Sequence, residues 1–282
     1  MRARALSVCG ALLLVACGGA AVESAAEPTT LHAPATNSAA FLLEVGANLA
    51  DVLARPEATI EELDAARRAA RGMERRRAER DLARAHLYAA EAGDERERAT
   101  HLREVRELTQ TSTRIRDEQL SADLDFLQLW ASWRLGQRVA EGRAQRFVEH
   151  HESARDLVLM AWLVRGEIAF EGERWDDALE GFRAVLGHLG HPLYAFALFR
   201  SAAVWREQGR EDDARQALTE VRDLGCAGDA SAPTIHIAIA AARALGETTL
   251  TDPSGRERPA SCPAEGAPSH GAVEDERPPI LQ

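Results

Sequence analysis

The chain has 282 residues and no lysine, so all 34 of its Lys or Arg positions are arginine. Without a side-chain amine, the sequence excludes Schiff-base catalysis, the lysine of the phosphate-binding P-loop, the strand lysine of protein kinases and the SxxK acylation base. A lysine-free chain with 54 alanines points to a GC-rich coding bias. Alanine, leucine, arginine and glutamate dominate, and because these residues favour helices, the composition predicts a helical globule.

The chain has a net negative charge and few cysteines. The net charge of −11 weighs against nucleic acid as a partner, because binding to phosphates needs a basic surface. Of the four cysteines, Cys9 and Cys17 lie near the N-terminus, and only Cys226 and Cys262 lie further along. In an oxidising compartment these last two form either a disulfide that fastens the tail or two independent thiols.

Long apolar runs are absent except at the N-terminus. Arg2 and Arg4 precede an apolar run, 5–16, that is too short to span a bilayer, which takes about 20 residues. This layout predicts an export signal. The run ends in Leu14-Val15-Ala16-Cys17, which resembles the lipobox of bacterial lipoproteins.

The lipobox resemblance implies that residues 1–16 are removed and that the thiol of Cys17 carries diacylglycerol, which anchors the chain in a membrane. Gly18 is not aspartate, which in enterobacterial lipoproteins implies transfer to the outer membrane, with the protein facing the periplasm. The alternative is an ordinary secretory signal that ends near Ala16 or Ala20.

Composition divides the remainder of the chain into segments. Residues 17–37 are rich in Ala, Ser, Thr and Pro and predict a flexible tether behind the lipidated cysteine. Residues 38–152 predict a helical region with degenerate repeats, and residues 153–246 predict clearer repeats. Six of the eleven prolines fall in 247–282, which predicts a disordered tail.

The pattern between the tether and the tail is helical throughout. No stretch shows sustained alternation of β-branched residues, and no Asn-Gly or Asp-Gly dipeptide predicts a hairpin. Thr59 and Glu62 have the spacing of a capping box, in which each side chain accepts a hydrogen bond from the other residue's backbone amide at a helix start. Helices are expected to begin near Ser38, Thr59, Asp94, Asp117, Val139, Ser153, Arg174, Pro192, Arg210 and Ala232.

An internal repeat is the strongest evidence for the architecture. The sequence around Arg174 recurs around Arg210, at an offset of 36 residues. The identical pairs are Glu171/Glu207, Arg174/Arg210, Asp176/Asp212, Asp177/Asp213 and Ala178/Ala214. A period of this length is typical of stacked helical hairpins. Residues 122–151 are compatible with a degenerate earlier copy.

The repeat resembles the tetratricopeptide repeat (TPR), whose pattern places tryptophan and glycine on a first helix, then a small residue and an aromatic on a second. The second copy departs from this pattern, with alanine in place of the glycine and leucine in place of the aromatic. The expected repeat core comprises Trp162, Gly166, Ala178, Phe182, Ala202, Trp205, Ala214 and Leu218. The resemblance implies an all-α fold of antiparallel helical hairpins stacked as a TPR-like solenoid, with a flexible N-terminal tether and a disordered C-terminal tail. The alternative is an irregular helical bundle that contains one such hairpin.

The TPR resemblance also implies a function, because the first helices of such hairpins line a concave groove that binds other proteins. By repeat register, the expected groove residues are Met160, Leu163, Glu167, Phe170, Phe196, Phe199 and Arg206. Met160, Phe196 and Phe199 are also compatible with the core. The resulting hypothesis is a non-catalytic, membrane-tethered periplasmic adaptor that binds envelope proteins, as in envelope or outer-membrane complex assembly. The alternatives are a periplasmic helical enzyme or metal-binding protein, and a structural spacer.

A search for catalytic and metal motifs is negative. No HExxH, CxxC or GxSxG pattern occurs, so no catalytic residue, metal or cofactor is expected. The adjacent His150 and His151 would point to different faces of a helix, and His188 and His191 fall in a glycine-rich turn. Eight arginines crowd residues 67–84, where either an acidic partner or lipid docks, or the helix is simply solvated.

Overall fold

The computed structural model describes residues 38–110, 115–227, 230–251 and 257–262. Within these ranges the all-α prediction is confirmed, because almost every described element is a helix. The helices are α1 (Ser38–Leu49), α2 (Ile60–Ala69), α3 (Gly72–Ala92), α4 (Glu95–Thr109), α5 (Glu118–Arg134), α6 (Val139–His150), α7 (Arg155–Glu171), α8 (Trp175–Leu186), α9 (Tyr194–Glu207), α10 (Glu211–Gly225) and α11 (Ala232–Ala244), with a short 3-10 helix η1 (Asp51–Leu53). Cys17 and the tether lie outside the described residues.

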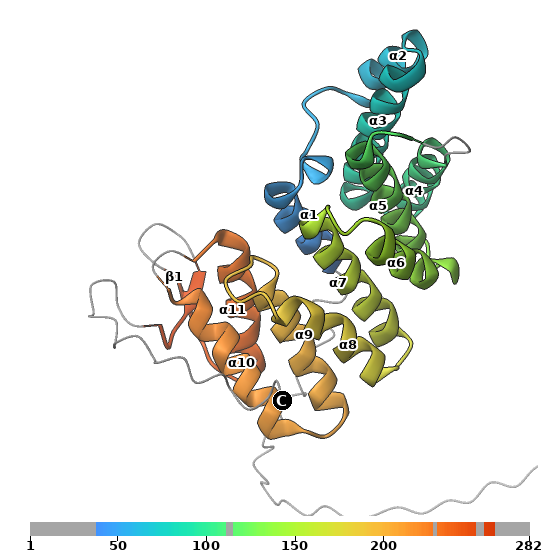
Figure 1. Cartoon of the computed structure of the whole chain (residues 1–282). Helices are drawn as coiled ribbons and strands as arrows, with labels where there is room; N and C mark the ends of the chain where they lie inside the picture. Colours follow the sequence, from blue (N-terminus) through green and yellow to red (C-terminus); the bar gives the residue numbers. More distant parts are fainter. Residues whose placement is uncertain (1–37, 111–114, 228–229, 252–256, 263–282) are drawn as a thin grey trace, which may run out of the picture.

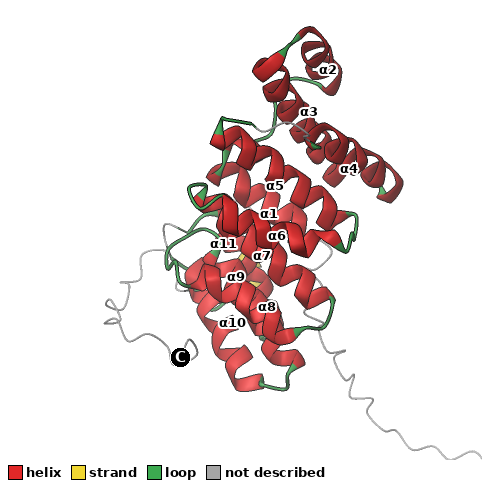
Figure 2. Cartoon of the chain, turned by 45° about the vertical axis from the view of Figure 1, so that its right-hand side comes forward, coloured by secondary structure: helices red, strands yellow, loops and turns green. Residues whose placement is uncertain are grey.

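From α2 to α11 the helices stack in chain order as antiparallel hairpins. The pairs α3–α4, α5–α6, α7–α8 and α9–α10 pack directly on one another, and α11 packs on α10. In Figure 2, α2 lies at one end of this stack and α10 lies at the other. The first helices of the hairpins also touch, α5 against α7 and α9 against α11, so together they form one face of the array.

Local sequence explains most of the helix starts. Thr59 and Glu62 form the predicted capping box, in which the Thr59 side chain accepts from the Glu62 amide and the Thr59 amide donates to the Glu62 carboxylate at 2.8 Å. The start of α3 at Gly72 is a correction to the predicted starts. Arg71 provides no side-chain cap there, and Gly72 adopts a φ of +56°, so the break carries no capping motif in the sequence.

One type of turn recurs along the array. A residue with positive φ follows α5, α7, α9 and α11, and the next amide donates to the carbonyl five residues earlier, which closes the helix as in a Schellman motif. These turns lie at Gly136, Glu173, Gly209 and Gly246, with the bonds Gln137–Ser132, Arg174–Ala169, Arg210–Trp205 and Glu247–Ala242. The turns are 36 or 37 residues apart, so the structural repeat extends from α5 to α11.

Helices α7 and α8 approach unusually closely because glycines line their contact. A Cβ atom added at Gly181 would lie 2.7 Å from the backbone nitrogen of Gly166, and one at Gly166 would lie 2.5 Å from the Phe182 ring. Both added atoms would overlap their neighbours. The predicted pairing of a small residue with an aromatic therefore has a direct structural counterpart at Gly166 and Phe182.

The prediction of disorder from residue 247 onward is wrong for the first part of the tail. Strands β1 (Thr249–Thr251) and β2 (Glu257–Pro259) form an antiparallel two-stranded sheet that packs on α11. Cys226 at the end of α10 and Cys262 beyond β2 form a disulfide with a Cα–Cα distance of 5.2 Å. Composition misses this order because a cross-link between distant residues, rather than a local pattern, fixes the segment. Residues 263–282 lie outside the described ranges.

Candidate functional site

The inner face of the array, formed by the first helices of the hairpins, is covered by α1, the first helix of the described residues. Figure 1 shows α1 lying beside α7, and α1 also contacts α11. On α9, the Phe196 ring stacks on Phe41 of α1 with centroids 5.1 Å apart and an interplanar angle of 19°. Helix α1 thus reaches α7, α9 and α11 and lies where the sequence predicts a groove.

The contacts of α1 with the array are apolar. Ala39, Leu42, Leu43 and Val45 are buried in the common core, whereas Glu44 is exposed. A Cβ atom added at Gly46 would lie 2.9 Å from the Cε atom of Met160 and 2.5 Å from the Cδ1 atom of Leu53. The glycine therefore allows the helix to lie close against the array.

The adjoining η1 is attached in a different way. The Tyr88 hydroxyl of α3 donates to the carbonyl oxygen of Leu53 at 2.7 Å, and a guanidinium nitrogen of Arg84 donates to the carbonyl oxygen of Asp51 at 2.7 Å. These bonds fasten η1 to α3 through its backbone. The chain is therefore held by hydrogen bonds just after α1, while α1 itself rests on apolar contacts.

The predicted groove residues are mostly inaccessible, which corrects the assignment of an open groove. Six of the seven are buried, and only Arg206 retains substantial exposure, at 33% of its side chain. The buried residues are Met160, Leu163, Glu167, Phe170, Phe196 and Phe199. The repeat register placed them on the inner face, but it could not show that α1 packs there. Replacing Phe199 would create a core cavity and would not test partner binding.

A buried ion pair joins α7 to α9 behind this face. Arg200 donates from Nε to Oε1 of Glu167 at 2.6 Å and from a terminal nitrogen to Oε2 at 2.9 Å. The side chains are 0% and 2% exposed, and the guanidinium carbon lies 4.1 Å from the Phe170 ring centroid. Arg200 was not among the predicted site residues. A lone arginine in the middle of the apolar α9 sequence was the available indication.

The predicted repeat core largely occupies the interior. Seven of its eight residues are buried, namely Gly166, Ala178, Phe182, Ala202, Trp205, Ala214 and Leu218. The eighth, Trp162, is half-buried, and the Arg165 guanidinium lies 4.8 Å from its ring centroid. This placement agrees with small residues and aromatics alternating across the helix contacts.

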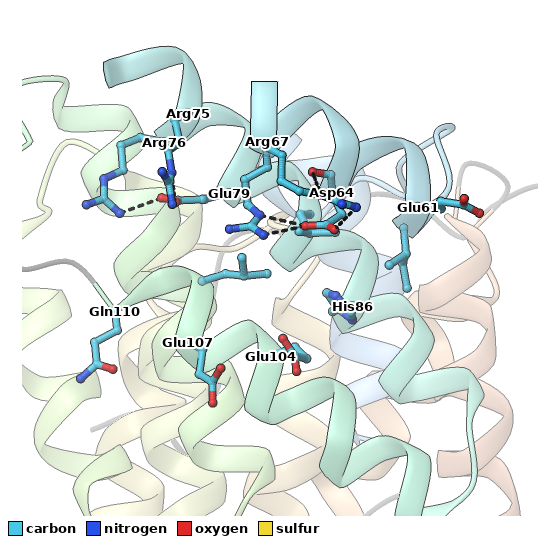
Figure 3. A pocket seen from close by; sticks show the side chains of 14 residues that line it. Glu61, Asp64, Arg67, Arg75, Arg76, Glu79, His86, Glu104, Glu107 and Gln110 are labelled. Atoms are coloured by element: carbon cyan, nitrogen blue, oxygen red, sulfur yellow. Dashed lines mark hydrogen bonds and ion pairs between the residues drawn. The ribbon is translucent and has the colours of Figure 1, made fainter. Parts of the chain in front are cut away.

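A second candidate site is the cleft between α2, α3 and α4, with a volume of about 860 Å³ (Figure 3). The arginine-rich segment lines it, but its charges are already paired. Arg67 and Arg68 bind Asp64 at 2.7 and 2.6 Å, and Arg76 binds Glu79 at 2.7 Å. A strongly basic surface is therefore not presented.

The same pairing extends along α3. Seven of the eight arginines in residues 67–84 form ion pairs with carboxylates, namely Arg67, Arg68, Arg75, Arg76, Arg77, Arg80 and Arg84. Arg80, for example, reaches Asp123 of α5 at 3.1 Å and so ties α3 to the array. This arrangement favours the solvated-helix interpretation of the cluster over a docking patch.

Two histidines meet beside this cleft. The Nδ1 atoms of His86 on α3 and His101 on α4 lie 2.9 Å apart, so one imidazole donates and the other accepts. Burial and then repulsion from His101 lower the pKa of His86 to about 4, although the Asp64 carboxylate opposes this. His86 is therefore neutral at neutral pH, and its protonation in the folded protein is disfavoured.

Two of the other histidines named from the sequence contact carboxylates. His151 Nε2 lies 2.9 Å from the Asp125 carboxylate, and His191 Nε2 lies 3.3 Å from that of Asp156. Among the described residues, no three His, Cys, Asp or Glu side chains are grouped so that they could hold a metal ion. In the same ranges, no helix combines the length and apolarity needed to cross a membrane.

Comparison with known proteins adds no identity to this geometry. The chain matches no family model, and no curated protein and no solved structure matches it.

Proposed function

We propose that the protein is a non-catalytic adaptor that binds protein partners through the inner face of its helical array. In this proposal it is tethered to the membrane through lipid on Cys17, faces the periplasm and serves envelope complexes. The observation that carries the proposal is the seating of α1, since a short apolar helix already lies across α7, α9 and α11. The stacked hairpins and their 36–37-residue repeat also support it, because such arrays bind partners along one face.

The chemistry of α1 describes the partner segment that the face would accept. The resident helix presents aliphatic side chains, one aromatic that stacks on Phe196, and a glycine at the close approach to Met160. A partner helix would therefore be apolar on one side and small at one position, as in other helix-in-groove complexes. It would replace α1 on the face, because both helices need the same surface.

The attachment of α1 makes such an exchange feasible. A 12-residue helix is marginally stable in water by itself, so α1 depends on the face for its structure. The hydrogen bonds from Tyr88 and Arg84 would keep η1 in place after α1 leaves. In the proposal, the N-terminal tether joins the membrane anchor directly to the helix that covers the binding face.

A labelled peptide with the sequence of residues 38–49 tests this proposal. The full chain with Leu42→Asp should release α1, because a carboxylate at this fully buried position is strongly disfavoured. The variant should then bind the peptide at 1:1 stoichiometry in a fluorescence anisotropy titration. The wild-type chain and the exposed-site control Glu44→Gln should bind it weakly. If Leu42→Asp keeps its helical circular dichroism and binds no peptide, the inner face is not a helix-binding site.

The membrane tether needs its own experiment. Labelled palmitate should enter the wild-type protein in bacterial cells and should not enter Cys17→Ser, because lipidation requires the thiol. Absence of label in the wild type would refute the anchor and leave the binding face unaffected.

A further inference from the structure

A small pocket between α5 and α6 lies apart from both sites described above. Its volume is about 320 Å³, and its wall includes the Asp125–His151 pair. The other lining residues are Ser121, Gln128, Arg143, Arg146, Phe147 and His150. Two positive charges therefore gather at one pocket, on a hairpin that contributes only its first helix to the inner face.

The arginines of this pocket differ from those along α3. Within the described part of the chain, neither Arg143 nor Arg146 forms an ion pair, whereas the arginines along α3 are mostly paired with carboxylates. A terminal nitrogen of Arg143 donates to the Gln128 side-chain oxygen. Its Nε atom is buried and donates to no acceptor. A buried N–H without an acceptor is costly and is normally satisfied by protein, water or a ligand.

The electrostatics agree with this geometry. Burial, and then repulsion from Arg146, lower the pKa of Arg143, while Asp125 opposes the shift and Arg106 adds to it. The Asp125 carboxylate is engaged at 2.9 Å by His151 Nε2. The His150 Nδ1 atom lies 2.8 Å from the Arg146 carbonyl oxygen, which holds that ring at the pocket. An anion in the pocket would relieve the repulsion between the two guanidinium groups.

We infer that this pocket binds a phosphate group. Two guanidinium groups offer forked donors that match phosphate oxygens, and the free Nε of Arg143 supplies a donor that no protein atom uses. The Ser121 hydroxyl and the Gln128 amide lie on α5, opposite the arginines of α6. Donors from two helices suit the three oxygens of a tetrahedral phosphate better than the two coplanar oxygens of a carboxylate. The phosphate belongs either to free inorganic phosphate or to the headgroup of an anionic phospholipid.

Calorimetric titration of the full chain with inorganic phosphate tests the site directly. Binding at 1:1 stoichiometry is expected, and Arg143→Gln with Arg146→Gln should weaken it about tenfold or more, since charge-assisted hydrogen bonds are lost. Arg183→Gln, which removes an exposed and unpaired arginine of α8, should bind phosphate as the wild type does. Arg146→Gln alone, at an exposed position, gives a second variant whose fold is not in question.

A separate experiment tests whether the phosphate belongs to a phospholipid headgroup. Vesicles of phosphatidylglycerol and of phosphatidylcholine are compared for binding of wild type and double variant, so that any effect of the anchor cancels. One outcome is that the double variant binds phosphatidylglycerol vesicles, but not phosphatidylcholine vesicles, more weakly than the wild type does, while the wild type binds no free phosphate. That result supports the site and assigns the phosphate to the lipid headgroup. The inference is overturned if the double variant equals the wild type with both probes, or if neither probe binds the wild type. Neither result bears on the α1 peptide experiment.

Discussion

The two ends of the molecule use the same arginine-rich, lysine-free composition in different ways. In α2 and the start of α3, arginines lie at the surface in short-range ion pairs, and α2 buries no residue at all. In α7–α10, glycines and alanines bring helices together around aromatics, and one ion pair is fully buried. The difference shows that position, rather than abundance, decides what an arginine contributes.

The comparison also separates charge from packing as sources of stability. Exposed ion pairs are worth about 0–1 kcal/mol each, because solvent screens them. Breaking a buried pair costs far more, since one charge remains without water or a partner. The array is therefore expected to be sensitive to single substitutions, and the α2–α3 region is expected to tolerate them.

The largest effect is expected at the buried ion pair. Glu167→Ala should lower the free energy of unfolding by about 3–5 kcal/mol, because it leaves the Arg200 guanidinium buried and unpaired. Chemical denaturation measures this change. The double variant Glu167→Leu with Arg200→Met should lose much less than Glu167→Ala, because no charge remains inside. A double variant as unstable as Glu167→Ala would contradict this interpretation.

The close contact of α7 and α8 should give the next largest effect. Gly181→Ala should destabilise the protein by about 1–3 kcal/mol, because the new methyl would overlap the Gly166 backbone, which cannot move independently. Gly142→Ala on α6, where an added Cβ meets only the end of a flexible arginine at 3.6 Å, is the matched control. Equal thermal unfolding midpoints for the two variants would show that the contact between α7 and α8 does not require glycine at position 181.

The lowered pKa of His86 predicts that the protein loses stability as the pH falls. The pKa of His86 is about 4 in the folded protein against an ordinary value of 6.5, so the unfolded chain takes up the proton first as the pH falls. The stability that neutral His86 contributes is complete above about pH 6.5 and declines towards pH 4. Thermal midpoints between pH 6.5 and 5 should fall more steeply for wild type than for His86→Gln. Parallel curves would exclude a role for the pair.

The smallest effect is expected among the surface arginines. Arg75→Gln should change the free energy of unfolding by less than about 1 kcal/mol, because the guanidinium is half exposed and Glu79 keeps its bond to Arg76. Urea denaturation of this variant beside Glu167→Ala compares the two regions under one condition. A loss as large as that of Glu167→Ala would remove the contrast between the regions.

Much of the fold could be predicted from sequence because its determinants are local. Thr59 with Glu62 identifies a capped start, and Gly166 with Phe182 identifies a close helix contact. The turns at Gly136 and Gly246 repeat the backbone geometry of Gly209, but their surrounding residues differ, so the longer repeat is visible only in the structure.

The site was less predictable because tertiary contacts determine it. Nothing local in residues 38–49 shows that Phe41 stacks on Phe196, about 150 positions away in the sequence. The pairing of Arg200 with Glu167, and the ordering of the tail by the Cys226–Cys262 disulfide, likewise depend on residues far apart in the chain. Periodicity predicted residues for an inner face, but it could not identify the helix α1 that contacts Met160 and Phe196 there.

Native-state hydrogen exchange tests the central claim, that α1 is a detachable occupant of the inner face, most directly. The amides of α1 are predicted to open at a free energy well below that of global unfolding, while those of α9 exchange only through global unfolding. Low concentrations of denaturant should leave the opening free energy of the α1 amides unchanged and should reduce that of the α9 amides. If α1 and α9 instead open together in one cooperative step, α1 is a permanent part of the core and the proposed exchange with a partner helix is wrong.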